Sequence, residues 1–137
     1  MLHRLFISHS WKYSEKYCRA VKFLNDDPDF EWTNSSVPEN KAFFGMTNAQ
    51  LKEQITKQIA YAQCVVILAG MYTNHSDWIS YEIDEALRMK KPIVAIRPWG
   101  AERTPVRVTL AANEVVGWNS KSITSAIKKL VAQRKFA

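Results

Sequence analysis

The sequence predicts a flavodoxin-like α/β fold: a doubly wound three-layer sandwich with a five-stranded parallel sheet and helices on both faces. Three observations predict it. Strand-like and helix-like segments alternate along the whole chain. The runs CVVILAG and PIVAIR are continuously apolar, as in central parallel strands that are covered on both faces. Loops rich in hydroxyl, amide and aromatic groups follow the strands, where folds of this class bind ligands.

Each expected element rests on a local pattern. Strands are expected at Leu2–Ser8, Phe30–Thr33, Cys64–Gly70, Pro92–Arg97 and Glu114–Gly117, where apolar or β-branched residues gather. Helices are expected at Lys12–Asn25, from a cap at Thr47 or Asn48 through Ile59, at Asp77–Lys91 and at Ser120–Arg134, each with apolar residues at helical spacing. The stretch MYTNHS and the segment between Arg97 and Glu114 are expected to be loops. No linker or repeat interrupts the series, so we expect one domain over residues 1–137.

Composition narrows the class of protein. The 137 residues are 47% hydrophobic and 23% charged, which is typical of a globular chain. The net charge of +6 is spread along the sequence, so we do not expect a nucleic-acid partner. No apolar run approaches the roughly 20 residues of a membrane span, and a strand begins at once without a signal peptide. We therefore expect a cytoplasmic protein with no membrane partner.

The potential metal and thiol ligands are few. Cys18 and Cys64 lie far apart with no CxxC spacing, so we expect two reduced, buried thiols. The three histidines, His3, His9 and His75, lack metal-ligand spacing. We expect no metal site.

The stretch DWISYEIDEAL, residues 77–87, is the most informative. On a helix, Ile79 and Ile83 centre an apolar stripe, and Trp78 and Glu82 share one flank of it at i, i+4 spacing. That position places the Glu82 carboxylate at the margin of the core, where it can face a crevice. Spacing alone leaves a second interpretation open, in which Trp78 packs at the helix start and Glu82 complements the positive end of the helix dipole.

Several motifs together resemble one family. FISHS at Phe6–Ser10 is similar to the opening motif of TIR domains, and WISYE at Trp78–Glu82 is similar to their catalytic helix motif. Further matches are WTNSSVP at Trp32–Pro38, VVILAGMY at Val65–Tyr72, KPIVAIRPWG at Lys91–Gly100 and VVGWNSKSI at Val115–Ile123. In this order they resemble the TIR-like domain family of bacterial Thoeris anti-phage defence.

The resemblance implies an activity. Members of this kind cleave nicotinamide from NAD⁺, and some cyclise the remaining ADP-ribose into a signalling nucleotide that activates a separate effector protein. It implies NAD⁺ as the substrate, no further cofactor, and self-association through TIR surfaces. An oxocarbenium-like transition state explains why one fixed carboxylate suffices, since cationic nicotinamide leaves without a general acid.

The resemblance also implies site residues. Glu82 is the expected catalytic carboxylate, and Trp78 and Tyr81 are expected to form an aromatic wall. The expected lining of the nucleotide cleft is Ser8, His9, Ser10, Asn34 and Ser36. Many TIR enzymes carry a basic residue just after the first strand, whereas His9 and Ser10 stand here. The sequence therefore does not decide whether backbone N–H groups, Lys12 or Lys41 contact the phosphates.

Two other functions remain open from sequence. One is a catalytically silent TIR interaction module, and the other is a different ribosyl-transferring enzyme on the same fold, such as a nucleoside deoxyribosyltransferase-like protein. Retention of Glu82 within WISYE favours the NAD⁺-cleaving enzyme. The loop Ser35–Met46, which contains Pro38 and Gly45, is expected to gate the cleft or to make an assembly contact.

Overall fold

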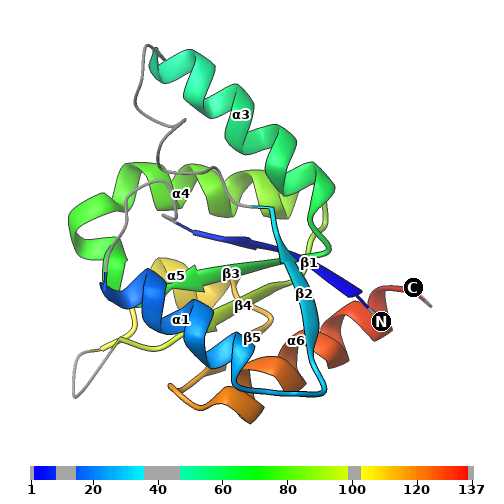
Figure 1. Cartoon of the computed structure of the whole chain (residues 1–137). Helices are drawn as coiled ribbons and strands as arrows, with labels where there is room; N and C mark the ends of the chain where they lie inside the picture. The colour runs from blue at the N-terminus through cyan, green and yellow to red at the C-terminus, as the bar shows by residue number, and fades with distance from the viewer. Residues whose placement is uncertain (1, 9–14, 36–46, 99–102, 136–137) are drawn as a thin grey trace.

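Five parallel strands form one sheet in the order β2-β1-β3-β4-β5 (Figure 1). The computed structural model describes residues 2–8, 15–35, 47–98 and 103–135. The strands are β1 (Leu2–Ile7), β2 (Glu31–Asn34), β3 (Cys64–Leu68), β4 (Ile93–Ile96) and β5 (Glu114–Val116). The helices are α1 (Glu15–Asn25), α3 (Asn48–Tyr61), α4 (Tyr72–Arg88), α5 (Val106–Ala111) and α6 (Ser120–Lys135), with a 3₁₀ turn at Ala69–Met71. The predicted flavodoxin-like α/β fold is confirmed.

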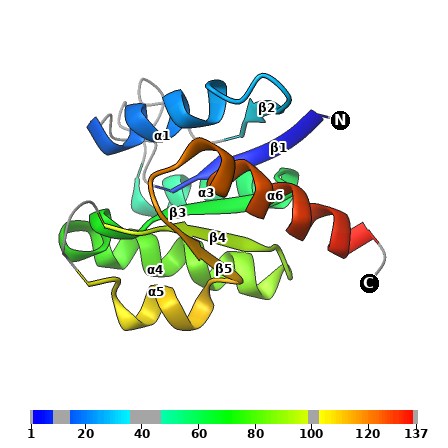
Figure 2. The ribbon, with the colours of Figure 1, turned by 90° about the horizontal axis from the view of Figure 1, so that it is seen from below.

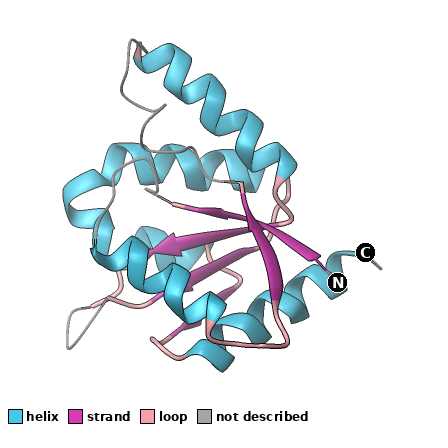
Figure 3. Ribbon diagram, viewed as in Figure 1, coloured by secondary structure: helices cyan, strands magenta, loops and turns pink. Residues whose placement is uncertain are grey.

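The helices cover both faces of the sheet (Figures 2 and 3). Helices α1 and α6 pack on one face, and α3, α4 and α5 pack on the other. Strand β3 lies at the centre and all five of its residues are buried. Val66 points into the core under α1 and α6, and Val65 points into the core under α3 and α4. This two-sided burial explains why the strand reads as an uninterrupted apolar run.

Helix α3 begins at the predicted cap. The Thr47 hydroxyl accepts a hydrogen bond from the Gln50 N–H at 3.1 Å, and the Gln50 side chain accepts one from the Thr47 N–H at 2.9 Å. Leu51, Ile55 and Ile59 are buried on its inner side, as their spacing predicts. Among the described residues, no helix is long and apolar enough to span a bilayer.

Two expected loops are wrong. Helix α4 begins at Tyr72, so MYTNHS belongs to the 3₁₀ turn and the first turns of the helix. Ser76 and Asp77 resemble a helix start, but no proline or glycine separates them from Tyr72, and nothing local prevents the helix from extending backwards. Helix α5 follows Pro105 in the segment expected to be irregular. Its six residues include two β-branched valines and carry a weak sequence signal.

The two cysteines differ in environment, and the expectation that both are buried is wrong for Cys18. Both are free thiols, but Cys18 is exposed on α1 whereas Cys64 is buried at the start of β3. Burial raises the pKa of the Cys64 thiol to about 12. Cys18 neighbours Tyr17, which is buried, and the helix turns Cys18 to the solvent side instead.

We expect the two thiols to react separately. In the native protein a chromogenic disulfide reagent should modify Cys18 readily, because this thiol is exposed and disulfide exchange requires access. Cys64 should react only when the chain unfolds, since it is buried and its pKa is high. Absorbance titration of native and denatured protein measures this, with Cys18→Ser as the control. Rapid modification of native Cys18→Ser would contradict the assignment.

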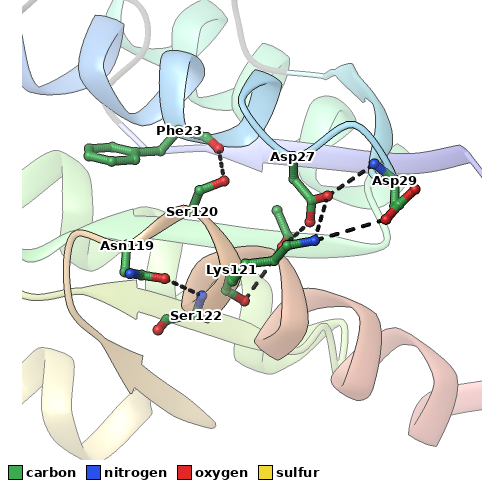
Figure 4. Close-up of polar contacts among 8 residues, drawn as sticks. Phe23, Asp27, Asp29, Asn119, Ser120, Lys121 and Ser122 are labelled. Carbon is green, nitrogen blue, oxygen red and sulfur yellow. Dashed lines mark hydrogen bonds and ion pairs between the residues drawn. The ribbon is translucent and has the colours of Figure 1, made fainter.

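A buried carboxylate joins the turn before β2 to the start of α6 (Figure 4). Asp27 accepts hydrogen bonds from the Thr124 hydroxyl at 2.7 Å, from the Lys121 ammonium at 3.0 Å and from the Asp29 N–H at 3.0 Å. Ser120 donates to the Phe23 carbonyl at 2.6 Å beside it. These contacts connect residues almost a hundred positions apart and fix α6 against the end of α1.

The charge of Asp27 should make stability depend on pH. Its hydrogen bonds to Thr124 and Lys121 lower the pKa from 3.8 to about 2. Because the folded pKa is depressed, the contribution is present above about pH 4 and is lost as the pH falls through the window from about 4 to 2. Asp27→Asn should melt at a lower temperature than wild type at neutral pH, and the difference should shrink below about pH 4. A difference that stays constant across this window would contradict the role.

Candidate functional site

The carboxyl ends of β1 and β3 meet at the point where the strand order reverses, which is where this fold class binds ligands. Ser8 lies there, immediately after β1, and is fully buried. Its hydroxyl accepts a hydrogen bond from the Leu68 N–H at 3.0 Å, and its own N–H donates to the Val66 carbonyl at 2.8 Å. Ser8 therefore joins the two strand ends. The expected lining residues His9 and Ser10 lie outside the described residues.

The carboxyl end of β2 lies beside the carboxyl end of β1. Asn34 pairs in register with Leu5 and is exposed, and its amide donates to the Tyr17 hydroxyl of α1 at 2.5 Å. Ser35 donates its N–H to the Leu5 carbonyl at 2.7 Å. Its side chain is buried, and its hydroxyl has no hydrogen-bond partner among the described residues. Ser36 and the remainder of the expected gating loop lie outside the described part of the chain.

Ser35 was not among the residues that sequence reasoning selected. The run Asn34-Ser35-Ser36 offers three polar side chains in succession after a strand, and alternation along β2 does not say which of them turns inward once the strand has ended. The structure buries the middle one. A buried hydroxyl beside the strand ends adds Ser35 to the candidate lining.

Glu82 lies on the buried side of α4. The helix buries Ile79, Glu82, Ile83 and Ala86, and each of them is 0% exposed. The three apolar members belong to the core cluster between this helix and the sheet. Glu82 is therefore inside the buried stripe, and the expectation that it lies at the margin is wrong. Trp78 lies on the flank, half-buried and packed against the same cluster.

The observed start of α4 decides between two interpretations of Glu82. The helix begins at Tyr72, so Glu82 lies ten residues beyond its first residue, almost three turns along. The field of a helix dipole on a side chain fades within the first turn. Helix-dipole complementarity therefore does not explain this carboxylate.

Tyr81 belongs to a polar contact between α3 and α4. Its hydroxyl lies 2.6 Å from the Thr56 hydroxyl and donates to the Lys52 carbonyl at 3.2 Å. Thr56 also donates to Glu85 at 2.7 Å, and Arg88 donates to Glu85 at 2.8 Å. The hydrogen bond from Arg88, helped by that from Thr56, lowers the pKa of Glu85. These contacts fix the Tyr81 ring against α3, and Tyr81 directly precedes Glu82 in α4.

Two surface hollows of the described chain lie away from these residues. One of about 500 Å³ runs along α1 and includes Cys18, Arg19 and Phe23. The other, of about 380 Å³, lies at the amino ends of β4 and β5. Within the described residues, no group of three or more His, Cys, Asp or Glu side chains could hold a metal ion.

Comparisons with known proteins identify both a family and a fold. The family model "Thoeris protein ThsB, TIR-like domain" matches residues 6–103. A crystal structure of a conserved protein from Enterococcus faecalis V583 has a TM-score of 0.64 and 13% identity, covering 94% of this chain and 99% of that one. A 3-dehydroquinate dehydratase-like protein from Bifidobacterium longum has a TM-score of 0.51 and 8% identity, covering 98% of both chains. At such identities these two structures share only the fold. A search of curated proteins found no match.

Proposed function

The chain belongs to the TIR-like domain family of the Thoeris protein ThsB, and from this premise we propose that it cleaves nicotinamide from NAD⁺. The reaction breaks the bond between C1 of the ribose and the pyridinium nitrogen. The bonding electron pair leaves with the nicotinamide, which becomes neutral, and the ribosyl group acquires positive charge at C1. Glu82 is the proposed catalytic residue that stabilises this cation.

Burial of Glu82 is the observation that carries the proposal. A carboxylate on the apolar side of a helix gives up its hydration, and Glu82 is 0% exposed there. Surroundings of low polarity also strengthen its attraction to a developing cation, and the fixed group needs no reorganisation as the charge appears. A carboxylate held in apolar surroundings is therefore suited to stabilise a cation, and charged groups in such surroundings cluster at functional sites.

The strand ends supply the proposed nucleotide-binding surface. Ser8 and Ser35 are buried hydroxyls at the ends of β1 and β2, and Asn34 presents an amide beside them. We propose that these groups bind the ribose and pyrophosphate together with His9, Ser10 and Ser36. Trp78 is the proposed aromatic wall against nicotinamide. The contacts of Tyr81 with α3 favour a positioning role, in which it supports the helix turn that carries Glu82.

We further propose that a nucleophilic atom of the ADP-ribose itself forms a bond to the C1 cation and releases its proton to solvent, giving a cyclic signalling nucleotide. Cyclisation requires that water be kept from C1 until the internal nucleophile arrives, and the buried position of Glu82 suits that requirement. The product would diffuse through the cytoplasm to a separate effector protein. Self-association of the chain through TIR surfaces is part of the proposal.

A catalytically silent TIR interaction module is the second candidate. The same complete burial of Glu82 supports it, because a substrate has to reach the carboxylate for catalysis to occur. The two functions differ in one observable. The enzyme converts NAD⁺, and the module leaves it intact at every protein concentration.

Mass analysis of NAD⁺ incubated with the chain tests the proposed function. Nicotinamide release with a product lighter than ADP-ribose by one water indicates cyclisation, and release with ADP-ribose itself indicates hydrolysis. A run in ¹⁸O water separates the two, because only hydrolysis incorporates the label. Intact NAD⁺ over a wide range of protein concentrations would favour the interaction module.

A further inference from the structure

A chain of hydrogen bonds joins α3 to α4 beside Glu82. Thr56 of α3 donates its hydroxyl proton to the Glu85 carboxylate at 2.7 Å, and its oxygen lies 2.6 Å from the Tyr81 hydroxyl. Each hydroxyl has a single proton, and that of Thr56 is used on Glu85. The Tyr81 proton is therefore shared between the Thr56 oxygen and the Lys52 carbonyl, which is 3.2 Å away. Thr56 is the central member of the chain, because it both accepts and donates.

The chain ends on a charged acceptor. Arg88 donates to both carboxylate oxygens of Glu85, at 2.8 and 3.1 Å, and the Glu85 side chain is only 14% exposed. The hydrogen bonds from Arg88 and Thr56 lower the pKa of Glu85, so this carboxylate is charged at neutral pH. Hydrogen bonds to an ionised acceptor are stronger than those between neutral groups, and a two-point contact adds geometric specificity. The contact between the two helices is therefore a directional one.

This contact lies on the side of α4 next to Glu82. At 100° per residue, Glu82 falls about 60° from Glu85 and about 60° from Ile79, in opposite directions around the helix. Ile79 is fully buried in the core cluster, whereas Tyr81 and Glu85 contact α3. Glu82 is therefore the member of the buried stripe that lies nearest to the hydrogen bonds with α3.

Apolar packing fixes the rotation of a helix less sharply than hydrogen bonds do. Leu51, Ile55 and Ile59 of α3 belong to the same core cluster as Ile79, but contacts of this kind are not directional. Because a helix side chain ends about 6 Å from the axis, a rotation of about 10° moves the Glu82 carboxylate by roughly 1 Å. A displacement of that size at a reacting centre can lower a rate by about 10²-fold. A directional contact that fixes the rotation of α4 therefore matters for a catalytic carboxylate.

We propose that Thr56 is a positioning residue for the cleavage of NAD⁺. Its hydroxyl, held between Tyr81 and Glu85, sets the rotation of α4. That rotation directs the Glu82 carboxylate toward C1 of the ribose. This inference rests on the proposed function, and in it Thr56 acts through α4 and not on the reacting atoms.

Thr56→Val is the test, and Thr124→Val is its matched control. Valine has the shape of threonine without the hydroxyl, and Tyr81 and Glu85 retain their other hydrogen bonds, so we expect Thr56→Val to fold. Thr124 also donates its hydroxyl proton to a carboxylate at 2.7 Å, that of Asp27, but it lies on α6 at the other face of the sheet. Each variant loses a hydroxyl–carboxylate hydrogen bond of the same length, and both should melt below wild type.

Initial rates of nicotinamide release over a range of NAD⁺ concentration separate kcat from KM. Thr56→Val should lower kcat about tenfold and leave KM within about twofold of wild type, because a positioning contact acts on the transition state. Thr124→Val should change neither constant by more than about twofold. Thr56→Ser keeps the hydroxyl and should recover kcat to within about threefold of wild type.

Hydrogen exchange of the free proteins, followed by mass spectrometry, gives a second readout that needs no NAD⁺. Relative to wild type, exchange in residues 78–86 of α4 should quicken more than exchange in α6 for Thr56→Val, and Thr124→Val should show the reverse.

Two kinetic results would overturn the positioning role while wild-type turnover upholds the proposed function. These are wild-type kcat in Thr56→Val, and an equal loss of kcat in the two valine variants. If wild type releases no nicotinamide, the proposed function fails and the exchange pattern decides alone. Faster exchange confined to α4 in Thr56→Val would still show that Thr56 fixes this helix, and an unchanged α4 would refute it.

Discussion

Replacing Glu82 by glutamine is expected to lower the rate of nicotinamide release from NAD⁺ by a factor of about 10²–10³. Glutamine retains the size and shape of the side chain and removes the negative charge that stabilises the ribosyl cation. An uncharged amide is also less costly to bury than a carboxylate, and Glu82 is 0% exposed. We therefore expect the variant to fold, with a melting temperature close to that of wild type.

Rates and melting curves of the same preparations measure both parts of this prediction. Lost turnover with a melting temperature close to that of wild type supports the catalytic role. A melting temperature far below that of wild type would make Glu82 a structural residue of α4, and equal turnover would remove it from the reaction.

Ile83→Ala is expected to lower the free energy of unfolding by about 2–5 kcal/mol. Ile83 neighbours Glu82 on the buried side of α4 and is fully enclosed by the core cluster under α3 and α4. Truncation removes its apolar contacts and leaves a cavity that the surrounding strands fill only in part. Chemical denaturation measures the loss, with the slope of the transition checked against wild type.

Leu87→Ala is the matched control for Ile83→Ala. Leu87 lies one turn further along the same helix and is 48% exposed, so its truncation should cost well under half as much. Comparable losses at the two positions would mean that α4 is not held to the sheet by the apolar stripe centred on Ile79 and Ile83.

The strand positions could be predicted because burial on both faces leaves a clear pattern. The strand β3 is apolar at every position, and β4 repeats this over Ile93–Ile96. Helix ends were harder to predict, because α4 starts directly after the 3₁₀ turn at Ala69–Met71 and not at a local capping residue. The short helix α5 was missed since Pro105 and Thr104 resemble a turn, and six residues are too few to establish a helical period.

The sequence selected the residues of the candidate site, and their geometry was less predictable. The spacing predicts Trp78 and Glu82 on one flank of the apolar stripe, whereas the structure leaves Trp78 on the flank and buries Glu82 within the stripe. Whether a position at the edge of an apolar stripe is open or buried depends on the elements that pack over it, and periodicity along one helix carries no such information. Ser35 was missed for a related reason, because alternation ends where the strand ends.

The most direct test of the central claim is a time course of nicotinamide release from NAD⁺, followed by chromatography, with wild type and Glu82→Gln compared side by side. The two proteins should be assayed over a wide range of concentration, so that any self-associated state is sampled. The account predicts that wild type releases nicotinamide and that Glu82→Gln does so about 10²–10³ times more slowly. Release at equal rates by the two proteins, or no release by wild type at any concentration, would contradict it.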